Sequence, residues 1–252
     1  MKLAFSNTVP KDWRDLQNQT ARFLNQAGYH AVSPCEISTA RGKVEVDVLV
    51  DSPDELVKRI ICECKYWDSA VPKEKVHAFR TVVADSGASL GLLISKSGFQ
   101  SGAIEAASYS NIQLITWDDF LSIVKDRWIL QNLKELKRLS APLSFYLNQL
   151  KFPFEKLKPD DKGEFRKLET KYLWLRWTCW KLSKTDLLND IEEKDNWYEI
   201  QSCSSIEEYI LFLQTEVAEA LQAFRKIVNH SDIAMSEPNY EDMPGFMFAF
   251  LE

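Results

Sequence analysis

The first half of the chain alternates between helical and strand-like patterns of apolar residues. Helical spacing runs from Pro10 to Ala27, with Gly28 as a stop signal, and again from Lys73 to Ala84. Short β-branched and apolar runs around these segments predict strands. The predicted strands are Ala31–Ser33, Val44–Val50, Arg59–Lys65, Leu90–Ser95 and Ile112–Ile115, with further helices from Ser101 to Ser108 and from Trp117 onward. Alternating strands and helices indicate an α/β sheet.

The second half has a different pattern, because strand-like alternation ends near Trp128. A long helix is predicted over residues 160–182. It carries a second apolar face rich in tryptophan, as a central helix of a bundle does. Another helix is predicted over residues 206–228. Before these two helices, Pro142 is expected to break a helical segment, since proline removes a backbone donor.

This change of pattern divides the chain into two predicted domains, an α/β domain over residues 1–127 and an all-α domain over residues 128–252. An apolar content of 45% indicates that both can bury a core. No apolar run approaches the length of a membrane span, and the N-terminus lacks the long apolar segment of a secretory signal. Five cysteines, an odd number, suit a reducing compartment. We therefore expect a cytoplasmic protein.

Four charged residues interrupt two of the predicted strands. The first strand, V-E-V-D-V-L-V, places Glu45 and Asp47 on one face, because side chains alternate along a strand. The second strand ends in I-I-C-E-C-K and places Glu63 and Lys65 on one face. If the two strands pair as a hairpin, the four charged groups can converge. Three carboxylates on an apolar sheet are costly unless they are compensated, which predicts a divalent cation at Asp47 and Glu63, beside Lys65.

An acid followed, after fifteen residues, by E-x-K resembles the signature of the restriction-endonuclease-like nuclease superfamily. Its surroundings resemble one branch, the Mrr-type (type IV restriction) catalytic domain, over about residues 8 to 125. The motifs that carry this resemblance are Ala27-Gly28-Tyr29, Asp47, Glu63-Cys64-Lys65, Tyr66-Trp67, Val71-Pro72-Lys73, the turn from Ile94 to Ala103, and Asp118-Asp119. The resemblance implies a restriction-endonuclease-like core, a mixed central sheet flanked by helices, here followed by the all-α domain.

The resemblance also implies a reaction, the hydrolysis of phosphodiester bonds in DNA with Mg²⁺, for which Mn²⁺ substitutes. By this resemblance, Asp47 and Glu63 hold the metal and the backbone carbonyl of Cys64 is a third ligand. Lys65 positions or deprotonates the attacking water and offsets the phosphate charge. Cys62 and the Cys64 side chain face the other side of the strand, where we expect them to be small buried hydrophobic groups.

The predicted first helix departs from the family pattern at Gln17, where family members often carry a glutamate that completes the metal site. Gln17 lies on an apolar stripe that is expected to face inward. This stripe consists of Trp13, Leu16, Gln17, Thr20 and Leu24. An inward amide can order a metal-bound water but supplies no charge. Glu45, on the Asp47 face, is the expected substitute and Glu36 is a weaker one, so Gln17 and Glu45 are the predicted supporting residues.

A net charge of −6 is unusual for an enzyme that binds nucleic acid. Lys43, Lys73 and Lys96 are candidate phosphate contacts, but a scattered solvated surface explains them equally well. Further basic residues of the first half are Arg41, Lys58, Arg59, Lys75 and Arg80.

Two functions remain open. One is a metal-dependent DNA endonuclease in bacterial defence against foreign or phage DNA, in which the helical domain serves recognition, homodimer formation or binding of a partner subunit. The other is a non-catalytic nuclease-fold subunit of a larger defence complex. Retained metal binding separates the two, because only the first function requires it.

Overall fold

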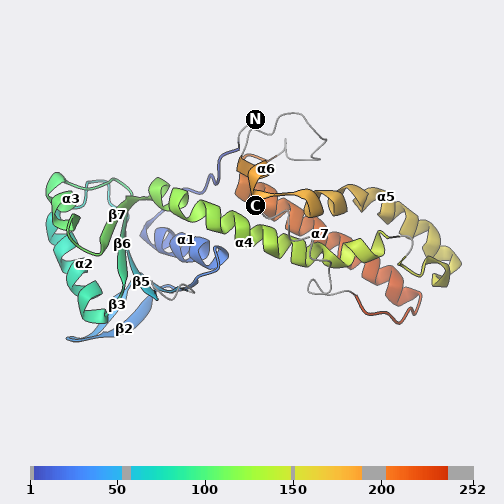
Figure 1. The fold of residues 1–252 in the computed structure, drawn as a ribbon, viewed down its shortest axis with the longest axis horizontal. Helices are drawn as coiled ribbons and strands as arrows, with labels where there is room; N and C mark the ends of the chain where they lie inside the picture. Colours follow the sequence, from blue (N-terminus) through green and yellow to red (C-terminus); the bar gives the residue numbers. More distant parts are fainter. Residues whose placement is uncertain (1–2, 53–57, 149–150, 189–202, 238–252) are drawn as a thin grey trace. The chain divides into compact units, whose positions relative to one another are not determined.

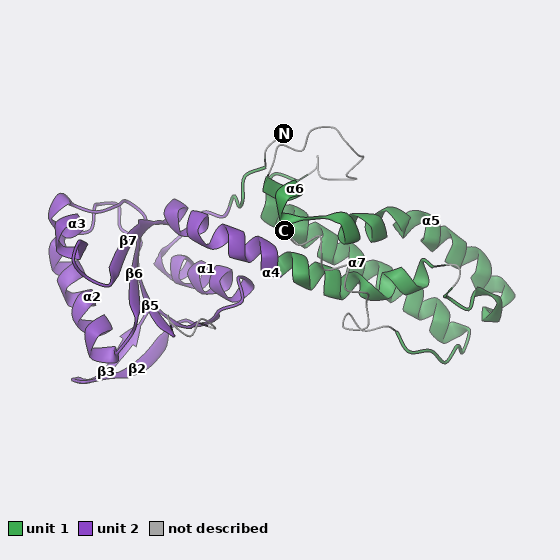
Figure 2. Ribbon diagram, in the orientation of Figure 1, with its two compact units in different colours: residues 1–7, 132–252 green, residues 8–131 purple. Residues whose placement is uncertain are grey.

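The structure is a computed structural model that describes residues 3–52, 58–148, 151–188 and 203–237 (Figure 1). The chain forms two compact units (Figure 2). One consists of residues 8–131, and the other of residues 1–7 together with 132–252. The first unit contains the strands, and the second is helical. Within the described residues, no helix is long and apolar enough to cross a membrane.

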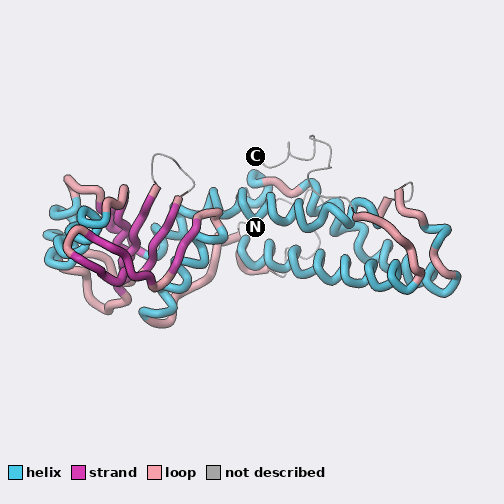
Figure 3. Tube along the Cα trace, turned by 90° about the horizontal axis from the view of Figure 1, so that it is seen from below, coloured by secondary structure: helices cyan, strands magenta, loops and turns pink. Residues whose placement is uncertain are grey.

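The first unit, residues 8–131, is built on a five-stranded mixed sheet with strand order β1-β4-β5-β6-β7. Its strands are β1 (His30–Val32), β4 (Val48–Asp51), β5 (Arg59–Lys65), β6 (Leu90–Ser95) and β7 (Ile112–Thr116), coloured magenta in Figure 3. β1, β4 and β5 pair antiparallel, whereas β5, β6 and β7 run parallel. The carboxyl ends of the three parallel strands therefore lie at one edge of the sheet, which is where Lys65 lies.

Helices cover both faces of this sheet (Figure 1). Helix α1 (Trp13–Gln26) lies on one face, and α2 (Lys73–Ser86) with α3 (Ser101–Ala107) lies on the other. The central strands are apolar on both faces, as strands covered on both sides are. The core under α2 includes Ile61, Leu93, Val76, Phe79 and Val83, which are all buried.

The predicted strand from Val44 to Val50 is wrong in one respect, because the chain bends at Asp47. Before the bend, β3 (Gly42–Val46) pairs with β2 (Cys35–Thr39) in a separate two-stranded ribbon. After it, β4 joins the main sheet, with Val48 opposite Cys62. Asp47 therefore lies between two sheets and not within one strand.

The second unit contains the later part of α4 (Trp117–Tyr146), the 3-10 turn η1 (Phe154–Lys156), α5 (Pro159–Lys181), α6 (Lys184–Leu188) and α7 (Ile206–His230). Its core is aromatic. The rings of Tyr146 and Phe224 stack at 5.0 Å, and those of Phe152 and Phe165 at 4.4 Å. Residues before the first unit also belong here, since the backbone N–H of Ile206 donates to the carbonyl of residue 4 at 2.9 Å.

Two expectations for the helical half need correction. Pro142 does not break a segment, because it lies inside α4, which runs for 30 residues. A proline costs a helix one hydrogen bond and crowds the preceding turn, but it does not have to end the helix. The second apolar face of α5 is only partly covered, since Leu173 and Trp177 are both exposed.

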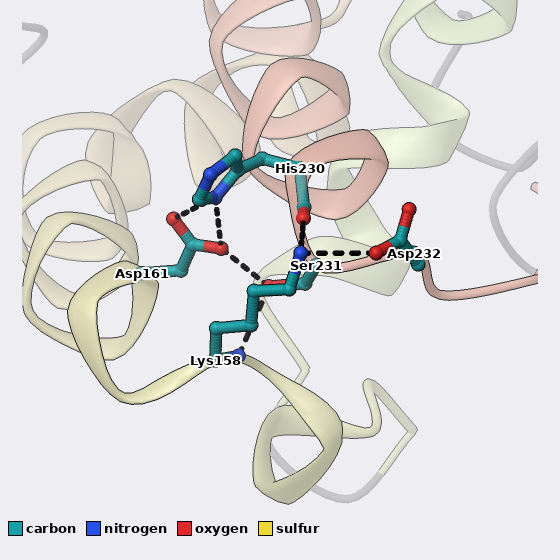
Figure 4. Close-up of polar contacts among 5 residues, drawn as sticks. All are labelled: Lys158, Asp161, His230, Ser231 and Asp232. Atoms are coloured by element: carbon teal, nitrogen blue, oxygen red, sulfur yellow. Dashed lines mark hydrogen bonds and ion pairs between the residues drawn. The ribbon is translucent and has the colours of Figure 1, made fainter.

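A polar cluster joins the end of α7 to the start of α5 (Figure 4). Asp161 is 6% exposed, and its carboxylate faces His230 Nδ1 at 2.8 Å and accepts a hydrogen bond from the Ser231 hydroxyl. The Ser231 hydroxyl accepts the backbone N–H of Lys158 at 3.0 Å, while Lys158 Nζ bonds Asp232 at 2.9 Å. Ser231 and His230 both turn toward the carboxylate and not toward each other. The cluster therefore ties two helix ends together and is not a nucleophile–base chain.

Candidate active site

Asp47 is held from two sides. The Gln17 amide, on α1, donates to Asp47 Oδ1 at 2.6 Å, and the backbone N–H of Cys64, on β5, donates to Oδ2 at 2.7 Å. The β4–β5 ladder ends at Val48 opposite Cys62, so the next free N–H on that side of β5 needs another acceptor. The Asp47 carboxylate takes that place. The bend in the chain at Asp47 and the end of the β4–β5 ladder together determine the orientation of the Asp47 side chain.

Glu63 and Lys65 lie two residues apart on β5 and share one face of the strand. Their side chains are both half-buried, and Lys65 Nζ donates to Glu63 Oε1 in a close ion pair. Both also interact electrostatically with Asp47. The structure thus brings together Asp47, Glu63 and Lys65, and adds Gln17 to them.

Burial raises the pKa of Asp47 above its ordinary value, and repulsion from Glu63 raises it further. The N–H of Cys64, the charge of Lys65 and the Gln17 amide oppose this rise without cancelling it. Two carboxylates, Asp47 and Glu63, face one ammonium group, that of Lys65, which leaves one negative charge in excess and favours an added cation.

The two cysteines of β5 face the interior. Burial raises the pKa of Cys64, and raises that of Cys62 to about 12, so both thiols stay neutral. Both side chains are buried, and the Cys64 sulfur lies 3.8 Å from the Thr20 hydroxyl on α1. They behave as small hydrophobic groups behind the acidic face of the strand.

Glu45, the expected substitute for a missing acid, lies elsewhere. It sits on β3, opposite Glu36 in the separate ribbon, and its side chain is exposed. Only three of the four charged groups therefore share the main sheet region, because the bend at Asp47 separates Glu45 from β4. Gln17 is the supporting residue that contacts Asp47.

The ammonium groups of three lysines lie near the rings of Tyr66 and Trp67, the two residues that follow β5. Lys65 Nζ lies 5.7 Å and Lys75 Nζ 5.8 Å from the centre of the Trp67 ring. Lys96 Nζ lies 4.4 Å from the centre of the Tyr66 ring. Each contact is a cation–π interaction, which holds a charged chain without neutralising it.

The three predicted phosphate contacts differ in their surroundings. Lys43 pairs with Glu36 at 2.7 Å, and Lys96 pairs with Asp68 at 2.6 Å, so both charges are already matched. Lys73 is exposed at the first position of α2. Lys75, whose Nζ lies 5.8 Å from the centre of the Trp67 ring, makes no ion pair among the described residues. Sequence alone could not rank Lys75 above the other basic residues, because nothing in its neighbours marks it.

Within the described residues, no group of three His, Cys, Asp or Glu side chains is placed to hold a metal ion. Magnesium prefers oxygen ligands and often uses only one or two carboxylates, filling the remaining positions with water and substrate. Asp47 and Glu63, with the uncompensated charge between them, fit such a site. The carbonyl of Cys64 as a third ligand stays a prediction.

Comparison with known proteins gives one family. Residues 11–124 match the family model described as a restriction endonuclease, the Mrr-type catalytic domain. A crystal structure of a protein of unknown function, AF1548, is similar over 40% of this chain and 56% of that one, with 18% identity and a TM-score of 0.37. No curated protein matches the chain. The predicted resemblance is confirmed over residues 11–124, which match the restriction-endonuclease family model; this region is a mixed sheet flanked by helices, and a helical half follows it.

Proposed function

We propose that this protein is a metal-dependent endonuclease that hydrolyses phosphodiester bonds in DNA, with its reaction centre at Asp47, Glu63 and Lys65. The observation that carries the proposal is the geometry of Asp47. Its carboxylate is oriented by two neutral donors, yet its charged form is destabilised by burial and by Glu63. A side chain that is positioned and left undercompensated in this way is a ligand for a cation.

Each residue has a role that follows from its contacts. Asp47 and Glu63 hold Mg²⁺ or Mn²⁺, which when bound supplies a Lewis acid at the phosphoryl oxygen. Gln17 and the Cys64 N–H keep both oxygens of Asp47 in one orientation, which lowers the cost of ordering the site. Lys65 Nζ, beside Glu63, positions the attacking water and offsets negative charge on the phosphate.

A second function is favoured by one observation, the neutral amide at Gln17. With an amide in place of an acid, the site has two carboxylates, and metal binding is correspondingly weaker. A nuclease-fold subunit that binds DNA or protein without cutting is the alternative. We extend the first proposal to defence against foreign DNA, with the helical half forming a homodimer or binding a partner subunit, on the strength of the family resemblance.

The test is cleavage of plasmid DNA, methylated and unmethylated, with Mg²⁺ or Mn²⁺. Wild type is compared with Lys65→Ala and with Asp51→Asn, an exposed aspartate at the far end of β4 that serves as the matched control. Cleavage by wild type and Asp51→Asn, but not by Lys65→Ala, supports the endonuclease. If no variant cuts, calorimetric Mn²⁺ binding that is lost in Asp47→Asn points to a missing activator. The absence of Mn²⁺ binding points to the non-catalytic subunit.

A further inference from the structure

Trp13 belongs to the apolar stripe of α1 that is predicted to face inward, but in the structure it is the exposed member of that stripe. The stripe predicts an inward ring, and Leu16, Thr20 and Leu24 are indeed buried. Trp13, at the first position of the helix, is 55% exposed. Helix α1 therefore presents an exposed indole ring at its first turn.

Trp13 lies on the face of α1 that also carries Gln17. Trp13 is four residues before Gln17, and residues at this spacing are neighbours on one face of a helix. Helical side chains lean toward the N-terminus, so the Gln17 side chain extends over the turn that carries Trp13. The same Gln17 amide contacts Asp47 at 2.6 Å. One helix face therefore carries an exposed aromatic ring and, one turn later, the group that orients the proposed metal ligand.

Trp13 has a cation beside it. The Arg14 guanidinium lies 5.1 Å from the centre of the ring, and the arginine is exposed. Among the described interactions Arg14 has no acidic partner. An exposed aromatic face with an adjacent unmatched cation is complementary to a nucleotide, since a base can stack on the ring while the cation attracts a phosphate.

Trp67 does not offer the same opportunity. It is partly buried against the core under α2, and the ammonium groups of Lys65 and Lys75 lie near its ring. Bases inside a duplex are stacked on each other and do not expose a face to such a ring. Stacking on Trp13 therefore requires a base that has left its stack.

We propose that Trp13 stacks on an unpaired nucleobase next to the phosphate that a metal held by Asp47 and Glu63 would bind. The preferred substrate is thus DNA with a single-stranded, mismatched or extruded base at the cleavage point. This inference rests on the proposed function for the location of the phosphate, and it adds the structural class of the DNA.

The chain offers a matched control in Tyr109, an aromatic residue that is 99% exposed. It lies in the turn before β7, at the amino end of that parallel strand. Lys65 lies at the carboxyl end of β5, which is the opposite edge of the sheet. Removing the Tyr109 ring also removes exposed aromatic surface, but at the edge of the sheet opposite Lys65.

The experiment measures binding of labelled oligonucleotides by fluorescence anisotropy, with Ca²⁺ in place of Mg²⁺. Three DNAs of equal length are used: a single strand, a duplex with a central mismatch, and a fully paired duplex. Trp13→Ala is expected to weaken binding to the first two by about tenfold and to the paired duplex by less than about twofold, because one base–ring stack is lost. Trp13→Phe recovers most of the affinity, and Tyr109→Ala binds as wild type does.

Several outcomes overturn the proposal: equal weakening on all three DNAs, no weakening at all, or the same loss in Tyr109→Ala. Circular dichroism and thermal melting establish that Trp13→Ala is folded, as expected for an exposed position. Failure of the proposed function looks different. If wild type never cuts DNA but Trp13 still discriminates unpaired bases, the stacking site stands within a binding subunit. If Lys65-dependent cleavage is present but Trp13→Ala changes nothing, only the stacking proposal falls.

Discussion

Asp47, which is partly buried, and Asp161, which is buried, lie one in each unit. Their surroundings shift the pKa of the two carboxylates in opposite directions. Both accept hydrogen bonds from two different groups of the protein. The pKa of Asp161 lies below its ordinary value, because the Ser231 hydroxyl and the His230 imidazole stabilise its charge. The pKa of Asp47 lies above its ordinary value, because burial and Glu63 destabilise its charge.

The difference separates a carboxylate with a structural role, Asp161, from the carboxylate that we propose as a metal ligand, Asp47. The charge of Asp161 is stabilised within the fold by Ser231 and His230. Asp161 also lies at the start of α5, where the helix dipole favours a negative charge. Asp47 is given a fixed orientation but not a neutralising partner. A hydrogen-bond count alone would rank the two as equal, and only the direction of the shift distinguishes them.

The largest expected effect comes from replacing each aspartate with asparagine. Asp47→Asn should abolish DNA cleavage and reduce Mn²⁺ affinity by more than the roughly 100-fold that loss of an outer-shell partner costs. Its Tm should change little, because relief from Glu63 offsets the loss of one of the two acceptor oxygens that face Gln17 and the Cys64 N–H. Asp161→Asn should keep cleavage and lower the Tm by several degrees. Plasmid cleavage, calorimetry and thermal melting measure the activity, the Mn²⁺ affinity and the Tm, and a reversed pattern in the two variants would contradict the comparison.

Gln17 tests whether orientation of Asp47 matters by itself. Gln17→Ala should weaken Mn²⁺ binding by about 10- to 100-fold, because the carboxylate loses one of its two donors. Gln17→Glu should bind Mn²⁺ more tightly than wild type and melt at a lower temperature without metal, since a third carboxylate joins the site. Gln19→Ala, on the same helix but bonded to Asp15 at 3.0 Å, is the control. Equal calorimetric affinities in all four proteins would contradict the role given to Gln17.

Two lysines, Lys75 in the first unit and Lys158 in the second, extend the comparison to DNA binding. Lys75, without an acidic partner among the described residues, should contact a phosphate. Lys75→Ala should therefore weaken DNA binding several-fold and reduce the slope of log affinity against log salt by about 1. Lys158 is held by Asp232, so Lys158→Ala should lower the Tm and leave the slope unchanged. Binding titrations at four salt concentrations measure the slopes. Identical slopes in the Lys75→Ala and Lys158→Ala variants would show that Lys75 does not contact a phosphate.

The smallest effect is expected at acid pH. A carboxylate whose pKa is lowered in the folded state stabilises the fold above its ordinary pKa of about 4, and this contribution is lost as pH falls through the lower, folded-state value. The Tm difference between wild type and Asp161→Asn should therefore be constant at neutral pH and shrink below about pH 4. Thermal melts from pH 2 to 7 measure it. A difference that grows toward acid would show that the Asp161 shift has the wrong sign.

Sequence predicted the parts of this fold that have a distinct pattern. β6 has the bounds expected from an unbroken apolar run, and E-x-K on a strand placed Glu63 and Lys65 on one face. The bend at Asp47 left no signal. Val46 and Val48 are both buried, so the alternation continues unchanged while the chain passes from one sheet to another. A pattern of faces cannot report which sheet a strand belongs to.

Trp13 and Pro142 were misjudged for related reasons. Helical periodicity assigns a face along the whole helix, but the first turn of α1 extends beyond what covers Leu16 and Thr20, so Trp13 stays exposed. A proline is read as a stop because of its local cost, yet α4 continues past Pro142. In both cases the deciding factor is tertiary packing, which local sequence does not contain.

The β2–β3 ribbon offers a practical opening for protein engineering. It leaves the main sheet at Asp47, and its turn, at residues 40–42, has open space around Gly42. The anchors of Asp47 come from α1 and β5 and not from the ribbon. Loops of other lengths and charges can therefore be grafted at that turn to change what the proposed nuclease contacts, while Asp47, the proposed metal ligand, keeps its place.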